Sequence, residues 1–151
     1  MSFWKTLQIG ASGLYAQRLR LDTISNNVAN AETTRTETGG PYQRKDVVFS
    51  AQNRMPFQAN LLLAKKNVGS SELKLNGVQV AKVVTDTTPG NKVYDPQNED
   101  ADADGYVNYP NVNLVVEMTN MLSATRSYEA NLAVIEAART MAQRALQIGQ
   151  A

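Results

Sequence analysis

The chain has 151 residues, with 15 Lys and Arg, 14 Asp and Glu, and neither cysteine nor histidine. This composition excludes disulfides, thiol nucleophiles, zinc sites built from Cys and His, and catalysis by a histidine base. The net charge of +1 gives no long-range attraction to nucleic acid or to an anionic membrane. No apolar run approaches the ~20 residues that cross a bilayer, and the length fits one domain.

A seven-residue apolar repeat runs through the first thirty residues. Its apolar members are Leu7, Leu14, Leu21, Ile24 and Val28. The repeat predicts a helix over about 3–29 with a narrow apolar stripe, as in the seam of a coiled coil. The asparagine-rich stretch 25–30 is expected to end it. Polar residues interrupt 1–10, so this segment does not resemble a cleavable secretory signal.

A second and longer helix is predicted over 114–148, where no proline occurs. Its apolar stripe has the members Met118, Met121, Tyr128, Leu132 and Ile135. The segment Asn111-Val112-Asn113, which follows Pro110, offers an N-cap for the helix, and Gly149 stands where a C-terminal glycine belongs. At ~1.5 Å per residue this helix would be roughly 50 Å long.

Between the helices the sequence is typical of strands and turns. Residues 73–80 alternate around Asn76-Gly77, which predicts a hairpin with a type I′ turn whose second arm continues through 81–85. Weaker strand patterns occur at 44–49 and 92–94. Residues 50–70 are compatible with a strand, a short helix or a covered loop.

These elements predict an α+β fold, in which long N- and C-terminal helices form an α-helical coiled-coil domain around a small β-rich insert. We expect three parts: residues 1–31 as the N-terminal helix, 32–110 as an extended link and the insert, and 111–151 as the C-terminal helix. The stripes fit an antiparallel pair within one chain. They also fit self-assembly, because helices this long project beyond any core that the insert can supply.

The acidic segment 100–105 matches the first half of an EF-hand calcium loop. Asn111 stands where a bidentate glutamate should close the loop, so a solvated acidic turn is the favoured interpretation. The carboxylates of 95–104 could serve a glycosidase, but that chemistry needs an apolar pocket around one of them. Residues 39–45 contain two glycines and two cations without a phosphate-loop frame, which favours a tight turn.

Several segments together resemble the bacterial flagellar basal-body rod proteins, specifically those of the proximal rod. The shared rod and hook signature resembles ASGLYAQR at 11–18 and LDTISNNVAN at 21–30. Segments closer to the proximal type are TTRT at 33–36, GGPYQRK at 39–45, YDP at 94–96, DADGYV at 102–107 and YPNVN at 109–113. The C-terminal matches are EM at 117–118 and RSYEAN at 126–131.

The resemblance implies a structural subunit, not an enzyme, that assembles helically in the basal-body rod and transmits motor torque. It implies export without processing by the flagellar type III apparatus. It also implies a place in the basal body, which is periplasmic where the host has an outer membrane. The expected partners are other rod proteins, further copies of the chain and the export apparatus, with no cofactor, metal, nucleic acid or small-molecule substrate.

We expect the assembly interface to contain both stripes, namely Leu7, Leu14, Leu21, Ile24, Val28, Met118, Met121, Tyr128, Leu132 and Ile135. Three alternatives stay open at this stage: an enzyme that uses the acidic turn, a calcium-binding module, and a helical adaptor that binds no rod protein.

Overall fold

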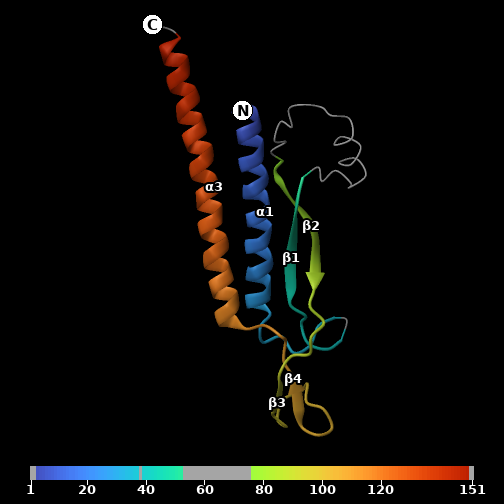
Figure 1. Ribbon diagram of the computed structural model, residues 1–151. Helices are drawn as coiled ribbons and strands as arrows, with labels where there is room; N and C mark the ends of the chain where they lie inside the picture. Colours follow the sequence, from blue (N-terminus) through green and yellow to red (C-terminus); the bar gives the residue numbers. More distant parts are fainter. Residues whose placement is uncertain (1–2, 38, 53–75, 150–151) are drawn as a thin grey trace, which may run out of the picture.

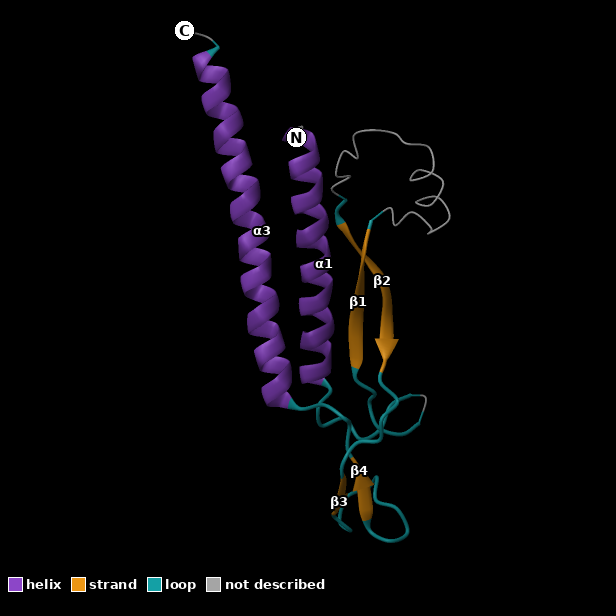
Figure 2. Cartoon of the chain, in the orientation of Figure 1, coloured by secondary structure: helices purple, strands orange, loops and turns teal. Residues whose placement is uncertain are grey.

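The computed structural model describes residues 3–37, 39–52 and 76–149. Two helices, α1 (Phe3–Ala29) and α3 (Leu114–Ile148), run antiparallel beside a ribbon of β1 (Lys45–Ala51) and β2 (Val78–Thr85). α1 is the middle layer, with α3 on one side and the ribbon on the other (Figure 1). A second ribbon, β3 (Lys92–Tyr94) and β4 (Tyr106–Asn108), lies beyond the end of the helix pair where α3 begins (Figure 2). This arrangement is the expected α+β fold.

Both predicted helices are present over the expected residues. At the start of α3 the side-chain oxygen of Asn113 accepts hydrogen bonds from the backbone N–H groups of Val115 and Val116, which confirms the predicted cap. Gly149 follows the last turn but keeps a right-handed conformation, with φ of −78°. Among the described residues, no helix is apolar over a stretch long enough to cross a membrane.

The two helices approach closely along a stripe of small residues, which we name the small-residue seam. Its members are Gly10, Gly13 and Ala16 on α1, and Ala124 and Ala138 on α3; all are buried. A Cβ at Gly10 would lie 2.8 Å from Cγ1 of Ile135, and one at Gly13 would lie 2.9 Å from the Asn131 amide. The absence of a side chain at these glycines therefore allows the helix backbones to come together.

The longer ribbon lies against α1 and confirms two of the predicted strands. β1 and β2 are antiparallel, with Val47 opposite Val83 and a bulge between Val48 and Phe49. The hydroxyl of Ser12 attaches the start of β2 to α1, because it accepts a hydrogen bond of 3.1 Å from the backbone N–H of Val78.

The predicted turn at Asn76-Gly77 is wrong. Gly77 does not have the positive φ that a type I′ turn requires, and its carbonyl instead accepts a hydrogen bond from the N–H of Gln52. The strand that follows pairs with β1, about thirty positions earlier in the chain. Tertiary pairing thus overrides the local turn signal. The first arm of the predicted hairpin, 73–75, and most of the ambiguous segment 50–70 lie outside the described residues.

The shorter ribbon carries the acidic turn. β3 confirms the predicted strand at 92–94, whereas its partner β4 was not predicted from the sequence. The rings of Tyr94 and Tyr106 meet edge to face at 5.3 Å across the pair. Gly105 closes the turn with φ of +77°, a conformation that favours glycine.

Candidate assembly surface

The end of α1, the segment 42–46 and the first turn of α3 meet in a network of polar side chains, which we name the polar junction. Its members are Asn27, Tyr42, Arg44 and Glu117, together with the backbone of Lys45. Asn27 and Glu117 are fully buried. Each buried polar group here needs a partner, because leaving one unpaired costs about 1–3 kcal/mol.

The side-chain amide of Asn27 forms two hydrogen bonds through its nitrogen and two through its oxygen. Its Nδ2 donates to the carbonyl of Lys45 at 2.8 Å and to Oε2 of Glu117 at 3.2 Å. Its Oδ1 accepts from the N–H of Lys45 and from the hydroxyl of Tyr42, both at 2.9 Å. One side chain therefore joins α1 to the start of β1 and to α3.

Glu117 forms an ion pair with Arg44 in the same place. Nε of Arg44 donates to Oε1 of Glu117 at 2.8 Å, and a second carboxylate, Asp46, lies 3.5 Å from Nη1. Burial alone would lower the pKa of the Arg44 guanidinium. The hydrogen bond and the charge of Glu117, with a contribution from Asp46, outweigh burial and raise the pKa above its ordinary value. Each oxygen of the Glu117 carboxylate therefore accepts a hydrogen bond, Oε1 from Arg44 and Oε2 from Asn27.

Tyr42 connects the link segment to the end of α1. Its hydroxyl lies 2.8 Å from Oδ1 of Asn26 and 2.9 Å from Oδ1 of Asn27. Burial, and secondarily the negative charge of Glu117, raises the pKa of this phenol above its ordinary value. The phenol therefore stays a neutral donor at physiological pH.

The predicted interface residues occupy three kinds of position. Ile24 is buried inside the chain. Met118 and Leu132 are exposed on α3, at 60% and 41% of their surface. The other seven are half-buried along the helix pair: Leu7, Leu14, Leu21, Val28, Met121, Tyr128 and Ile135.

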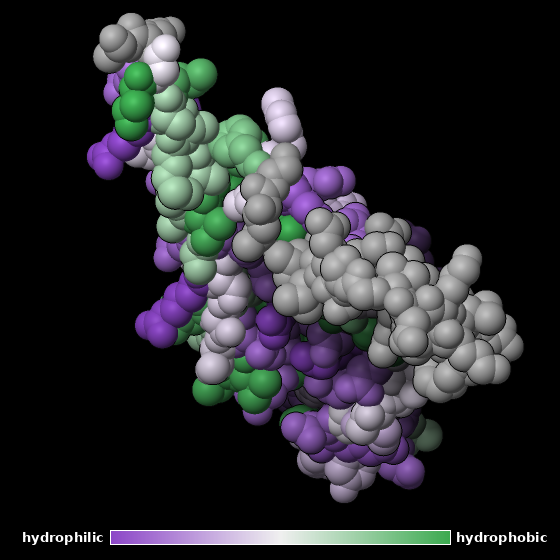
Figure 3. All heavy atoms as spheres, turned by 45° about the horizontal axis from the view of Figure 1, so that its top comes forward, coloured by the Kyte–Doolittle hydropathy of each residue, from purple (hydrophilic) through white to green (hydrophobic). Residues whose placement is uncertain are grey.

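α3 exposes many large apolar side chains. Its exposed large apolar residues are Leu114, Val115, Val116, Met118, Leu122, Leu132, Val134, Met141, Leu146 and Ile148. Figure 3 shows hydrophobic side chains gathered on the projecting end of this helix. Many exposed large apolar side chains on one helix mark a candidate interaction site, and α3 is therefore the candidate assembly surface of the chain.

The acidic turn is held by contacts within the chain. Oδ2 of Asp100 accepts a hydrogen bond of 2.7 Å from the hydroxyl of Thr34, and its Oδ1 lies 3.6 Å from Nη1 of Arg35. Asp102 and Asp104 are exposed. Throughout the described residues no group of three or more acidic side chains is placed to hold a metal ion. Asp102 and Asp104 thus face solvent, whereas Asp100 is held by Thr34 and Arg35.

Sequence reasoning missed the small-residue seam and the polar junction. A signal for the seam was present, since Glu117, Ala124, Asn131 and Ala138 recur every seven residues and all point toward α1 or the junction. The larger apolar residues beside this series dominate the heptad pattern, so the seam was not predicted. The junction had no such signal, because its members are separated by up to 90 positions.

Two family descriptions match the ends of the chain. "Flagella basal body rod protein" matches residues 7–35, which include most of α1. "Flagellar basal body rod FlgEFG protein C-terminal" matches residues 103–148, which include β4 and α3. The first match contains Asn27 and the second contains Glu117, whereas Tyr42 and Arg44 lie between the two matches.

Whole-length relatives agree with these matches. The chain is 42% identical over 154 residues to the flagellar basal-body rod protein FlgC of Bacillus subtilis, covering 99% of this chain and 100% of the relative. It is 40% identical over 157 residues to FlgC of Borreliella burgdorferi, covering 99% of each. For FlgC of Salmonella typhimurium the identity is 38% over 150 residues, covering 99% of this chain and 100% of the relative. The chain therefore belongs to the flagellar basal-body rod proteins and, within them, to the FlgC family. The relatives' names describe rod proteins, and none of these names refers to a reaction.

Proposed function

We propose that the chain is a structural subunit of the proximal rod in the flagellar basal body, where it assembles helically with further copies and with other rod proteins. The observation that carries this proposal is the exposed apolar surface of α3 in a member of the FlgC family. Exposed apolar surface of this extent is typical of a site that contacts another protein, and repeated copies of a subunit can cover it.

The polar junction supports a role in transmitting motor torque. A subunit that transmits torque must not let its helices turn relative to the part outside them. Asn27 and Glu117 connect α1, α3 and the link segment through buried hydrogen bonds. Networks of this type hold a unique arrangement when every member is paired.

The packing of α1 on α3 supports a division of the chain into parts. We propose that residues 1–31 and 111–151 form the assembling helical domain, and that 32–110 form an outer link and insert. The further proposal, that the flagellar type III apparatus exports the chain unprocessed, is supported by the family resemblance.

The experiment compares charges placed on and off the apolar surface of α3, in a strain that lacks its own copy of the protein. Met118→Asp and Leu132→Asp each place a charge where a neighbouring subunit would bury it, at a cost of several kcal/mol. We expect both variants to abolish motility and to be absent from purified basal bodies. Ser123→Asp is the matched control. Ser123 is exposed, and the residues one turn before and after it are all polar: Thr119, Asn120, Arg126 and Ser127.

A double variant of the acidic turn, Asp102→Ala with Asp104→Ala, separates this proposal from an enzyme or a calcium protein. Both side chains are exposed, so their removal should leave motility intact. Paralysis of the Asp102/Asp104 variant with a correctly built rod, combined with normal swimming of the Met118 and Leu132 variants, would refute the structural role.

A further inference from the structure

The sulfur of this chain is carried by methionine alone. Five methionines and no cysteine occur in the sequence. Three of the methionines, Met118, Met121 and Met141, lie on α3. Met118 and Met141 are 60% and 66% exposed, whereas Met121 is half-buried. A peroxide oxidises a thioether only where it can reach the sulfur, so Met118 and Met141 are the two open positions on this helix.

Met118 lies among apolar side chains, most of them exposed. Residues three and four positions apart are neighbours on the surface of a helix. At those spacings Met118 has Leu114, Val115, Met121 and Leu122, which together with Met118 we name the Met118 cluster. Leu114, Val115 and Leu122 are exposed. The side chains of this cluster contain no hydrogen-bond donor.

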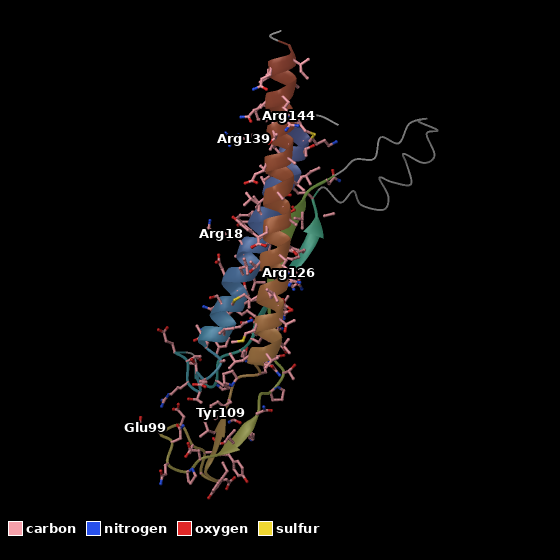
Figure 4. All side chains as sticks on the ribbon, turned by 90° about the vertical axis from the view of Figure 1, so that its left-hand side faces the viewer. Arg18, Glu99, Tyr109, Arg126, Arg139 and Arg144 are labelled. Atoms are coloured by element: carbon pink, nitrogen blue, oxygen red, sulfur yellow. The ribbon has the colours of Figure 1, made fainter. Side chains whose placement is uncertain are left out.

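Met141 has a similar exposure in different surroundings. At the same two spacings its neighbours are Ala137, Ala138, Arg144 and Ala145. None of these is a large apolar residue, and the guanidinium of Arg144 is a hydrogen-bond donor. Figure 4 shows Arg144 toward the C-terminal end of α3. Met141 is therefore the matched comparison for Met118, because it offers a sulfur of similar exposure outside the Met118 cluster.

Hydrogen peroxide converts the thioether of methionine into a sulfoxide. The sulfur gives up two electrons, the O–O bond of the peroxide breaks, a sulfur–oxygen bond forms and water leaves. The new oxygen accepts hydrogen bonds, but the Met118 cluster has no donor for it. The nearby hydroxyl of Thr119 already donates to the carbonyl of Val115 at 2.9 Å. An apolar partner surface that covered the cluster would therefore leave the sulfoxide oxygen unpaired, which is unfavourable.

We propose that Met118 is an oxidation site for peroxides, and that its sulfoxide prevents a copy of the chain from entering the rod. This inference rests on the proposed function, in which other subunits cover α3, and adds a regulation of that same surface. A free copy exposes the thioether, whereas an assembled copy buries it. Enzymes that reduce methionine sulfoxide restore the thioether, so the block is reversible.

The first measurement is the rate of oxidation at each sulfur of α3 in the full-length chain. The purified protein reacts with hydrogen peroxide at neutral pH, and peptide mass spectrometry follows the sulfoxide at Met118, Met121 and Met141. We expect Met118 and Met141 to react within about threefold of each other, and Met121 at least about threefold more slowly, because exposure sets access to the sulfur. Circular dichroism checks that the helices persist during the reaction.

The second measurement asks whether a polar group at position 118 excludes the chain from the rod. Met118→Gln introduces an uncharged polar group of similar length, and Met118→Leu keeps an apolar side chain that a peroxide does not oxidise. In a strain that lacks its own copy, we expect Met118→Gln to be at least about tenfold less abundant in purified basal bodies than Met118→Leu. Met141→Gln makes the same polar change outside the Met118 cluster, and its abundance should stay within about threefold of the unchanged chain.

The third measurement tests the oxidation itself. Non-motile cells of the same strain express the chain from an inducible copy during a brief exposure to sublethal hydrogen peroxide, and the fraction of cells that become motile is counted. Peroxide should lower this fraction at least about threefold more for the unchanged chain than for Met118→Leu. Met141→Leu removes the comparison sulfur and should give no such protection.

The proposal is overturned if Met118 is oxidised no faster than Met121, or if Met118→Gln and Met118→Leu enter basal bodies equally. It is also overturned if Met118→Leu gives no protection against peroxide. Each of these results leaves the structural role standing as long as Met118→Asp and Leu132→Asp are excluded from basal bodies. Normal swimming of those two aspartate variants would instead count against the proposed function.

Discussion

The side chain of Asn27 pairs with the backbone of Lys45 in both directions. Its Nδ2 donates to the Lys45 carbonyl at 2.8 Å, and its Oδ1 accepts from the Lys45 N–H at 2.9 Å. A neighbouring strand would make the same two bonds to a residue at the start of β1. The end of α1 therefore provides, through one amide, the partner that the first residue of β1 would otherwise lack.

Asn27→Asp tests this pairing with almost no change in shape. The variant loses the donor to Lys45 and puts a carboxylate beside the buried Glu117. We expect it to lower the free energy of unfolding by about 3 kcal/mol or more. Urea unfolding followed by circular dichroism measures the loss.

The matched control is Asn26→Asp, one residue earlier. Asn26 is exposed, and its Oδ1 accepts a hydrogen bond from Tyr42, which an aspartate oxygen still does. We expect the control to change stability by less than about 1 kcal/mol. Equal losses for the two variants would contradict the assigned role of Asn27.

Removing one partner of the ion pair between Arg44 and Glu117 should cost more stability than replacing both partners with apolar residues. Arg44→Met leaves Glu117 buried and uncompensated, with 1% of its side chain exposed. Removal of one partner of a buried pair typically costs about 3–5 kcal/mol. Because 21% of the Arg44 side chain is exposed, we expect a loss near the lower figure. Adding Glu117→Leu should recover part of that loss, as an unfolding series on both variants would show. A double variant less stable than Arg44→Met contradicts the prediction.

The raised pKa of Tyr42 predicts a loss of stability at alkaline pH. Burial, and then the charge of Glu117, raises its pKa above the ordinary 10.0, so the folded state holds the phenol proton more tightly than the unfolded state. The resulting stabilisation is complete below pH 10.0 and is lost as pH rises through the folded-state pKa. Tyr42→Phe removes this dependence. The difference in unfolding free energy between the two proteins should therefore shrink as pH rises above 10.0 through the folded-state pKa, and a constant difference would count against the prediction.

The absence of cysteine makes the register of the helix pair directly testable. Gly13→Cys with Asn131→Cys places two thiols where a Cβ at Gly13 already approaches the Asn131 side chain. We expect rapid disulfide formation under mild oxidation, seen as faster migration on a non-reducing gel. Gly13→Cys with Leu132→Cys is the control, since Leu132 is 41% exposed and belongs to the apolar surface. Cross-linking of the control pair at the same rate would refute the register.

The sequence predicts the helices well because their signals are local. The cap at Asn113 and the absence of proline through 148 place α3 correctly. The predicted turn at Asn76-Gly77 is wrong because the structure there depends on a distant segment. A turn signal describes a preference of two residues, whereas the partner of β2 is a strand that lies before position 52. Pairing between distant segments decides the structure there.

The candidate site was predictable only in part, for the same reason. The apolar stripes locate Met118 and Leu132 on α3. The expectation that large apolar side chains from both stripes meet between the helices did not include the small residues found there. Gly10 and Gly13 on α1 leave room there for the side chains of Ile135 and Asn131 on α3, because close approach of two backbones needs small residues. The polar junction combines residues from three separate segments, and no local pattern in any one of them indicates the others.

The position of α1 as the middle layer has a consequence for the order of folding. Its buried face is completed by α3, and the bond between Asn27 and Glu117 joins residues 90 positions apart. A chain that emerges N-terminus first carries α1 without this partner until its last 35-residue helix is free. Contacts between distant segments form slowly, since a long loop must close first. The helix pair is therefore expected to form at the end of folding, when the whole chain has emerged.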